Sequence, residues 1–217
     1  FVNEVERKTP FKREFLPEVT AMFERLAPYG PFYLKLVMGN LWLFGPVLKP
    51  VLGMISAQAG AMLQTTIAFT VQSGSDAYNV LPQEATLGAN MRFIPHQGEK
   101  ESLEIIRKLA EKHDLEMEIL HSNDYSNSVD INGEAFKLVE ETIGKTFPGL
   151  PVSPYVMTGA TDAHFYEEIC HSCVRFAPVI YGPEQMKGIP WLNENIEYDC
   201  LPGAVEFYKN LIKAQMR

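Results

Sequence analysis

The cysteines are the first residues whose types and spacing suggest chemistry. Cys170, His171 and Cys173 lie in a Cys-His-Ser-Cys run, and two thiols at this spacing are typical of zinc sites and redox centres. A four-ligand zinc site needs a second pair of ligands, whereas Cys200 is the one other cysteine of the sequence. Because free cysteine is among the most buried residue types, we interpret all three as structural thiols, buried or at helix ends.

The net charge limits the partners that the chain can have. Its 217 residues carry 19 Lys and Arg against 27 Asp and Glu, a net charge of -8. Non-specific binding to nucleic acid depends on cationic contacts with phosphates, so we expect no nucleic-acid partner. Apolar residues make up 46% of the chain and charged residues 21%, which is typical of a folded globular protein.

The cysteine count indicates the cellular compartment of the protein, and the first residues indicate whether the chain is part of a longer one. An odd number of cysteines fits a reducing compartment, so we predict a cytoplasmic location. The chain starts at Phe1 without an initiator Met or an apolar signal core. This start indicates a piece of a longer chain.

The first segment, residues 1–64, differs in charge from the rest of the chain. It has seven Lys or Arg and five Asp or Glu, a net charge of +2, and the remainder has a net charge of -10. Its residues 28–54 mix four prolines with aromatic side chains such as Trp42, which is typical of short broken helices with apolar faces. Such faces can cover a partner domain, line an apolar substrate entrance or lie at a membrane surface, and the sequence does not choose among these.

Residues 50–75 carry no charge over the length of a membrane span. Gly, Ser, Gln and Thr residues dilute this stretch, and it ends in the alternation of Ile67, Phe69 and Val71 that is typical of a strand. We therefore expect neither a membrane span nor membrane contact of this stretch.

The middle segment, residues 65–124, has the pattern of a small sheet with a helix. We predict strands at 65–72 and 84–94, an amphipathic helix at 99–112 and a third strand at 115–119. In the second strand one face holds Leu87, Ala89, Met91 and Phe93, so we expect this strand to be half-buried. The β-β-α-β order favours an open-faced antiparallel sheet with helices on one side.

The last segment, residues 125–217, follows the polar run 122–128 and alternates helix and strand. We predict a helix at 133–146, a strand at 152–157, a short helix after Asp162, a strand at 174–180 and a last helix on 204–212. This alternation indicates a largely buried sheet. The fold class of the whole chain is thus α/β (α+β), with boundaries near residues 64 and 124.

Three stretches resemble a known family of enzymes. They are Tyr-Asn-Val-Leu-Pro-Gln-Glu-Ala at 78–85 running into Ala-Asn-Met-Arg-Phe at 89–93, Thr-Gly-Ala-Thr-Asp-Ala-His-Phe-Tyr at 158–166, and Asn-Glu-Asn at 193–195. Together, in this order, they resemble the di-zinc aminoacylase and carboxypeptidase S-like metallopeptidase family, over residues 65–200.

This resemblance implies a fold, a cofactor and partners. The middle segment would be a ferredoxin-like lid, through which such proteins form homodimers, inserted in an α/β catalytic domain whose C-terminal part is the last segment. The implied substrates are small peptides or N-acyl amino acids, and the implied cofactor is a pair of zinc ions. Residues 1–64 would then be the end of a lid helix followed by an apolar helical insertion.

The resemblance also assigns substrate contacts. Asn79 and Arg92 match lid residues that hold the substrate carboxylate and its carbonyl oxygen, for which an amide donor and a guanidinium fork are suited. Gly159 matches a glycine whose backbone amide lies against the substrate. His164 stands where many relatives carry Arg, so we expect a substrate or lid contact there.

Two further pairs of residues are implied to lie near the site. Thr161 and Asp162 match a Thr-Asp pair that caps the next helix, a role for which Asp is suited by its own chemistry. Asn193 and Glu194 match the end of a His-Gly-x-Asn-Glu motif whose His is the last zinc ligand. In this chain Pro190 occupies the position of that His, and proline offers no donor atom to zinc.

Pro190 and the family residues that this chain lacks leave two interpretations open. The other zinc ligands and the general base of the family belong to a segment before residue 1, so this chain has neither a catalytic residue nor a metal ligand of its own. The first interpretation is a fragment of a zinc metallopeptidase or aminoacylase that hydrolyses amide bonds only in the full-length protein. The alternative is a catalytically inactive module of the same fold, used for dimerisation or interaction.

Overall fold

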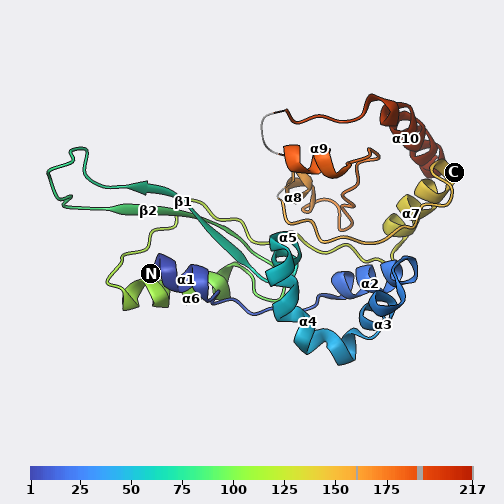
Figure 1. Ribbon diagram of the computed structural model, residues 1–217. Coiled ribbons are helices and arrows are strands. Elements are labelled where there is room, and N and C mark those ends of the chain that lie inside the picture. The colour runs from blue at the N-terminus through green and yellow to red at the C-terminus, as the bar shows by residue number, and fades with distance from the viewer. Residues whose placement is uncertain (160, 190–192, 217) are drawn as a thin grey trace. The chain divides into compact units, whose positions relative to one another are not determined.

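The structure is a computed structural model that describes residues 1–159, 161–189 and 193–216 (Figure 1). It has two compact units. Unit 1 comprises Phe1–Ser126 and Tyr155–Thr161, and unit 2 comprises Asn127–Pro154 and Asp162–Arg217. The described residues are a mixture of helices and one two-stranded antiparallel sheet, which is compatible with the predicted α/β class.

Unit 1 begins with a series of helices: α1 (Val2–Arg7), α2 (Pro17–Leu26), a 3-10 turn (Ala27–Tyr29), α3 (Phe32–Met38), α4 (Leu41–Ile55) and α5 (Ala57–Ala61). The predicted broken helices are confirmed, because α3 and α4 meet at an angle of 101°. Among the described residues no single helix is long and apolar enough to cross a membrane, although the bent α3–α4 pair has the necessary length and composition.

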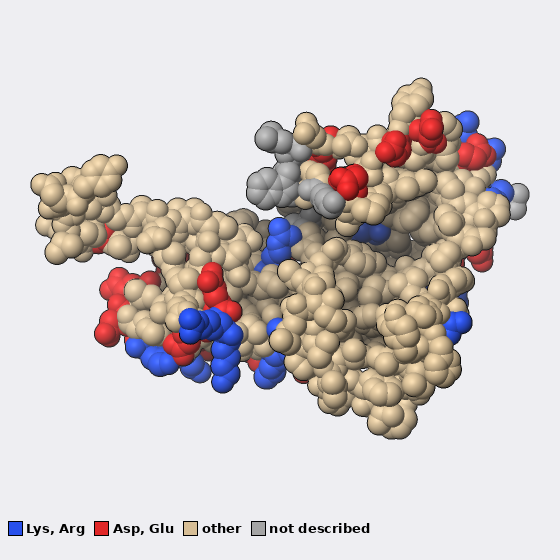
Figure 2. All heavy atoms as spheres, in the orientation of Figure 1, with Lys and Arg blue, Asp and Glu red and all other residues tan. Residues whose placement is uncertain are grey.

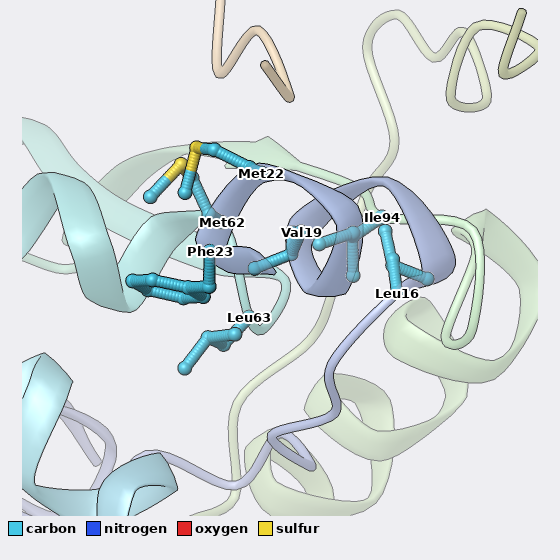
Figure 3. Packing of buried hydrophobic residues seen from close by; sticks show 7 residues of the cluster. All are labelled: Leu16, Val19, Met22, Phe23, Met62, Leu63 and Ile94. Carbon is cyan, nitrogen blue, oxygen red and sulfur yellow. The ribbon is translucent and has the colours of Figure 1, made fainter. Parts of the chain in front are cut away.

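The core of unit 1 forms around α2. Pro17 suits the first turn of this helix, since it has no N–H that needs a partner there. Seven buried residues of the cluster are shown in Figure 3: Leu16, Val19, Met22, Phe23, Met62, Leu63 and Ile94. Val156 packs against the same cluster, and this contact places the 155–161 segment in unit 1.

The sheet of unit 1 confirms two of the predicted strands. Strands β1 (Thr66–Ser73) and β2 (Thr86–Arg92) are antiparallel, with Thr66 opposite Arg92 and Ser73 opposite Thr86. The prediction of a half-buried second strand holds at Met91, whereas Leu87 and Ala89 are exposed. The outer end of the hairpin projects beyond α1 and α6, so it has no layer against which to bury a face (Figure 1).

The helix after the hairpin is confirmed with its predicted bounds, as α6 (Glu99–Lys112). Ile106 and Ala110 are buried on one side, and the predicted outer pair of Glu104 and Lys108 lies 3.3 Å apart.

The third strand predicted at 115–119 is wrong. This segment has no regular secondary structure and pairs with no strand in the described part of the chain. Apolar and acidic residues alternate along this segment, yet the apolar side chains of Leu115 and Ile119 are each 43% exposed. A strand requires a hydrogen-bonding neighbour as well as a pattern, and the described sheet pairs β1 and β2 with each other alone.

Unit 2 is built from α7 (Glu134–Thr146), α8 (Ala163–Tyr166), α9 (Pro183–Gly188), a 3-10 turn (Tyr198–Cys200) and α10 (Leu201–Gln215). The predicted helices at 133–146, after Asp162 and on 204–212 are confirmed. Helices α7 and α10 pack together, and Asn210 Nδ2 donates to Thr146 Oγ1 at 3.1 Å.

The two strands predicted in this unit are wrong. Residues 152–157 and 174–180 have no regular secondary structure and no ladder partner in the described chain. Ile180 is 65% exposed and Phe176 is 40% exposed, although Phe176 packs on Phe207 with ring centroids 4.9 Å apart. An apolar run shows that a segment needs to be covered, but it does not supply the neighbouring strands of a sheet.

Candidate functional site

Arg92 is the residue around which a candidate site can be built. It is the last residue of β2, where strand pairing with Thr66 fixes its backbone. Its side chain is exposed, and Nη1 donates a hydrogen bond to the carbonyl oxygen of Thr158 at 2.6 Å. A guanidinium has five N–H donors, so this bond can orient the group while other donors serve a ligand.

Gly159 lies directly beside this guanidinium. A Cβ placed on Gly159 would be 3.6 Å from Arg92 Nη1. The segment that carries Gly159 is held at two further points, since Val156 packs on the core and Gln58 Nε2 donates to the Tyr155 hydroxyl at 2.7 Å. The structure therefore brings together Arg92 and Gly159, two residues that the sequence motifs single out.

Asn79 lies elsewhere in unit 1. It is an exposed residue of the loop that joins β1 to β2, beyond the pair of Ser73 and Thr86. Arg92 is at the opposite end of β2, about 20 Å away along an extended strand. Within one chain the structure does not bring Asn79 and Arg92 together, and the substrate contact of Asn79 stays a prediction.

Asp162 and His164 belong to unit 2. Asp162 is the N-cap residue of α8, as predicted, but its side chain makes no capping hydrogen bond. The reason is its helical backbone, with φ -62° and ψ -10°, because a side-chain cap requires an extended conformation. His164 is half-buried and packs edge-on to Phe165, with ring centroids 5.7 Å apart. Thr161, half-buried, is the last residue of the 155–161 segment.

Asn193 and Glu194 are exposed residues of a turn in unit 2. Asn193 adopts a left-handed backbone with φ 69°, a conformation that Asn tolerates better than most residues. Its carbonyl oxygen accepts a hydrogen bond from Asn195 Nδ2 at 2.6 Å. Ala160 and Pro190 lie outside the described residues, so the prediction for Pro190 rests on sequence alone.

Sequence reasoning missed the residues that hold these segments. Thr158 supplies a carbonyl, which no side-chain pattern reveals, and Gln58 lies in the short helix α5 with no distinguishing motif. Gln185 is 8% exposed, and its Nε2 donates to Glu197 Oε1 at 2.8 Å. A buried amide is visible only in the folded chain, because Gln is usually a surface residue.

The cysteines give no sign of a metal or redox site. All three are free thiols. Cys200 is buried, and its Sγ donates to the Glu197 carbonyl at 2.9 Å. Cys170 is exposed and follows the turn after α8, so it lies at a helix end, the other of the two predicted places for these thiols. Partial burial, together with the neighbouring Cys170, raises the pKa of the Cys173 thiol. A raised pKa reduces the thiolate that metals and electrophiles require.

A pair of zinc ions does not fit the residues that the structure describes. Residues 1–159, 161–189 and 193–216 contain no group of three or more His, Cys, Asp or Glu that could hold a metal ion. What these residues offer is a cationic group against an accessible backbone, which can bind and orient an anion.

Comparison with known proteins places this geometry in context. Residues 22–214 match the model of peptidase family M20/M25/M40. The N-fatty-acyl-amino acid synthase/hydrolase PM20D1 of Xenopus tropicalis is 34% identical over 88% of this chain, and that of Homo sapiens is 26% identical over 90%. The probable carboxypeptidase S-like 2 of Dictyostelium discoideum is 24% identical over 98%.

The matches cover only part of these relatives. The chain spans 38% of the Xenopus protein, 39% of the human protein and 40% of the Dictyostelium protein. No solved structure matches the chain.

Proposed function

The chain belongs to peptidase family M20/M25/M40, and from this premise we propose that it forms part of an enzyme that hydrolyses the amide bond of N-acyl amino acids or small peptides. The relatives are named hydrolases and carboxypeptidases, which supports a hydrolase in general. The substrate class and the contribution of this chain are the new elements of the proposal.

The observation that carries the proposal is the position of Arg92 against Thr158 and Gly159. N-acyl amino acids and peptides share a free carboxylate one carbon away from the amide nitrogen of their last residue. A guanidinium binds such a carboxylate through two parallel N–H groups, and a glycine lets the substrate approach the backbone. Arg92 would therefore fix the carboxylate, which orients the neighbouring amide bond for attack.

The acyl group of the substrate is proposed to be a long alkyl chain. The relatives of Xenopus and Homo sapiens carry the name N-fatty-acyl-amino acid synthase/hydrolase. The stretch between Lys35 and Lys49 carries no charge and includes Leu36, Val37, Leu41 and Phe44. Apolar surface of this kind suits an alkyl group better than a peptide backbone.

The proposal includes the lid and a zinc cofactor. The order β1, β2, α6 agrees with the first three elements of a ferredoxin-like lid. To complete such a lid, the segment 115–119 would have to pair with a neighbouring strand. The proposal includes a homodimer formed through this lid. We assign the zinc ligands to sequence outside the described residues. Dialysis of the full-length protein against a chelator should then abolish hydrolysis, and zinc should restore it.

The role of Arg92 can be tested with a pair of substrates. One is an N-fatty-acyl amino acid, and the other is the same compound with its carboxylate converted to a carboxamide. In the full-length protein Arg92→Ala should raise KM for the acid at least about tenfold, the effect of losing a charged hydrogen bond, with little change for the carboxamide. Arg92→Lys should be intermediate, since it keeps the charge without the fork.

Arg107→Ala is the matched control, because Arg107 is a surface residue of α6 that pairs with Glu104. It should leave both substrates unaffected. An equal loss for acid and carboxamide in Arg92→Ala would show that Arg92 acts through folding, and no loss would remove it from the site.

A second candidate is the inactive interaction module, which the proline at position 190 favours. The two candidates predict different effects of Pro190→His in the full-length protein. Zinc content and activity that appear only in Pro190→His would indicate a hydrolase that has lost a ligand. A folded protein with neither zinc nor activity in both forms would indicate the module.

A further inference from the structure

Helix α4 exposes a face that is entirely apolar. Its outward residues follow two rows at a spacing of four, one from Trp42 and the other from Leu43. All eight are exposed and none is polar: Trp42, Leu43, Pro46, Val47, Pro50, Val51, Met54 and Ile55. Trp42 is 79% exposed, Met54 84% and Ile55 76%. We call these eight residues the α4 outer face.

The inward side of the same helix carries its one charge. Lys49 is half-buried, and its ammonium group lies 5.9 Å from the centre of the Phe15 ring. Gly45 is buried against Phe15, and Leu52 packs on the core of unit 1. A helix at a water-exposed surface turns its polar side chains outward, so α4 has the opposite polarity and its outer face is suited to an apolar surrounding.

The segment that carries the α4 outer face has charges of one sign. From Ala27 to Gln64 the chain contains Lys35 and Lys49 and no Asp or Glu. Lys35 is exposed on α3, beside Phe32 and Tyr33, which are 80% and 65% exposed. Figure 2 shows an uncharged surface over α3 and α4 without acidic groups. Such a surface complements an apolar layer bordered by anions.

The two prolines on the outer face determine how deep it can lie. Pro46 and Pro50 are inside the helix, and because proline has no N–H, the carbonyl oxygens of Trp42 and Pro46 lack the usual donor four residues later. In the hydrocarbon of a bilayer an unpaired carbonyl is costly, whereas water and headgroups satisfy it at the interface. The bend of 101° between α3 and α4 also fits a pair of helices in the interfacial plane.

We propose that the α4 outer face docks on the surface of an anionic phospholipid layer, with Trp42 and Tyr33 at headgroup level and Lys35 near the phosphates. A second copy of the chain would add another Lys35 and no Asp or Glu from residues 27–64, so it offers this lysine no counter-charge and is disfavoured as the occupant. The expectation of no membrane contact rested on the polar residues of 50–75. The polar side chains of this stretch begin at Ser56, after the end of α4, so they do not interrupt the α4 outer face.

The test uses the full-length protein and vesicles of phosphatidylcholine with or without phosphatidylserine. The protein should sediment with the anionic vesicles. In a full-length variant that keeps Trp42 and has its other tryptophans, Trp191 among them, replaced by Phe, the emission should shift to the blue on vesicle addition. The double variant Val47→Asp, Met54→Asp should lower the partition coefficient at least about tenfold, because two charges enter the apolar layer.

Val205→Asp is the matched control, since Val205 is an exposed valine of another helix, α10 (54% exposed, against 66% for Val47). It should change the partition coefficient less than about twofold. Lys35→Glu should weaken binding to the anionic vesicles and leave binding to pure phosphatidylcholine unchanged.

Three results would overturn the proposal. The first is a wild-type protein that binds neither kind of vesicle. The second is a double variant that no longer folds by circular dichroism, because this would place the face inside the full-length protein. The third is a molar mass by light scattering that halves in the double variant without lipid, because the occupant would then be a second copy.

Discussion

At the scale of the residue, Arg92 is exposed but not free to move. Its backbone lies in the β1–β2 ladder and its guanidinium donates to the carbonyl of Thr158, 66 residues away in the sequence. An unrestrained Arg side chain loses about 2 kcal/mol of rotamer entropy when a ligand orders it. Because the Thr158 bond has already ordered the side chain, less of this entropy remains to be lost on binding a carboxylate.

Gly159→Ala separates a structural from a functional role of this glycine. The added Cβ would make ordinary contact with Arg92 Nη1 at 3.6 Å, so the melting temperature should stay within about 2 °C of wild type. If the substrate lies against the Gly159 backbone, the methyl group should raise KM for an N-acyl amino acid at least about fivefold, or about 1 kcal/mol. Unchanged KM with unchanged stability would remove Gly159 from the site.

The residues of the candidate site could be predicted from sequence only in part. Arg92 and Gly159 belong to motifs, and motifs can be read. The capping bond expected of Asp162 could not be judged, because it depends on a backbone conformation that neighbouring residues impose. The carbonyl of Thr158 has no sequence signal, since every residue carries one.

At the scale of the element, one buried residue joins three segments of unit 1. Gln97 is 1% exposed, and its side-chain Oε1 accepts from the backbone N–H of Lys12 at 2.9 Å. The backbone carbonyl oxygen of Gln97 accepts from Thr65 Oγ1 at 2.8 Å and Ser102 Oγ at 2.9 Å. The N-terminal segment, the residue before β1 and the first turn of α6 are thereby connected.

Gln97→Leu should be strongly destabilising for this reason. The leucine leaves the Lys12 N–H without its acceptor, which costs about 2 kcal/mol of unfolding free energy. Urea denaturation followed by circular dichroism measures the change. Gln72→Leu on the exposed part of β1 is the control and should change the free energy by less than about 0.5 kcal/mol. Equal effects of the two substitutions would contradict the role of Gln97.

The stability that the contact between α1 and the end of α6 contributes should depend on pH. Glu4 Oε1 accepts from Lys112 Nζ at 2.7 Å and Oε2 lies 2.6 Å from His113 Nε2. The hydrogen bonds from Lys112 and His113 lower the pKa of Glu4 from 4.5 to about 2. A carboxyl with a lowered pKa stabilises the fold above its unfolded pKa, and this contribution is lost as the pH falls toward the folded value.

Glu4→Gln should therefore lower the urea midpoint at neutral pH, and its difference from wild type should shrink as the pH falls from 4.5 toward 2. Glu6→Gln, at an exposed position of the same helix, is the control. A difference that is independent of pH would show that the Glu4 contact does not contribute through its charge.

Helices were predictable from sequence and most strands were not, for a physical reason. The bounds of α6 follow from its own periodicity, because the hydrogen bonds of a helix are local. The hairpin of β1 and β2 was found because its two strands are neighbours in sequence. The segments 115–119, 152–157 and 174–180 carry strand patterns, but pairing depends on a distant segment that a local pattern does not identify.

At the scale of the whole molecule, the chain is about two fifths as long as the relatives that it matches. Its described residues contain a guanidinium held against the Thr158 carbonyl but no group that could hold a metal ion. Binding and orientation without an activated nucleophile do not hydrolyse an amide. We therefore propose that this chain supplies the substrate-orienting part of an enzyme whose reaction needs residues from elsewhere in the full-length protein.

The most direct test of this claim is to measure hydrolysis of one N-fatty-acyl amino acid, with zinc present, by the full-length protein and by residues 1–217 alone. We predict release of the free amino acid by the full-length protein only, and a rise in KM when Arg92 is replaced by Ala. Hydrolysis by residues 1–217 alone, or a folded full-length protein that hydrolyses no N-acyl amino acid, would contradict the account.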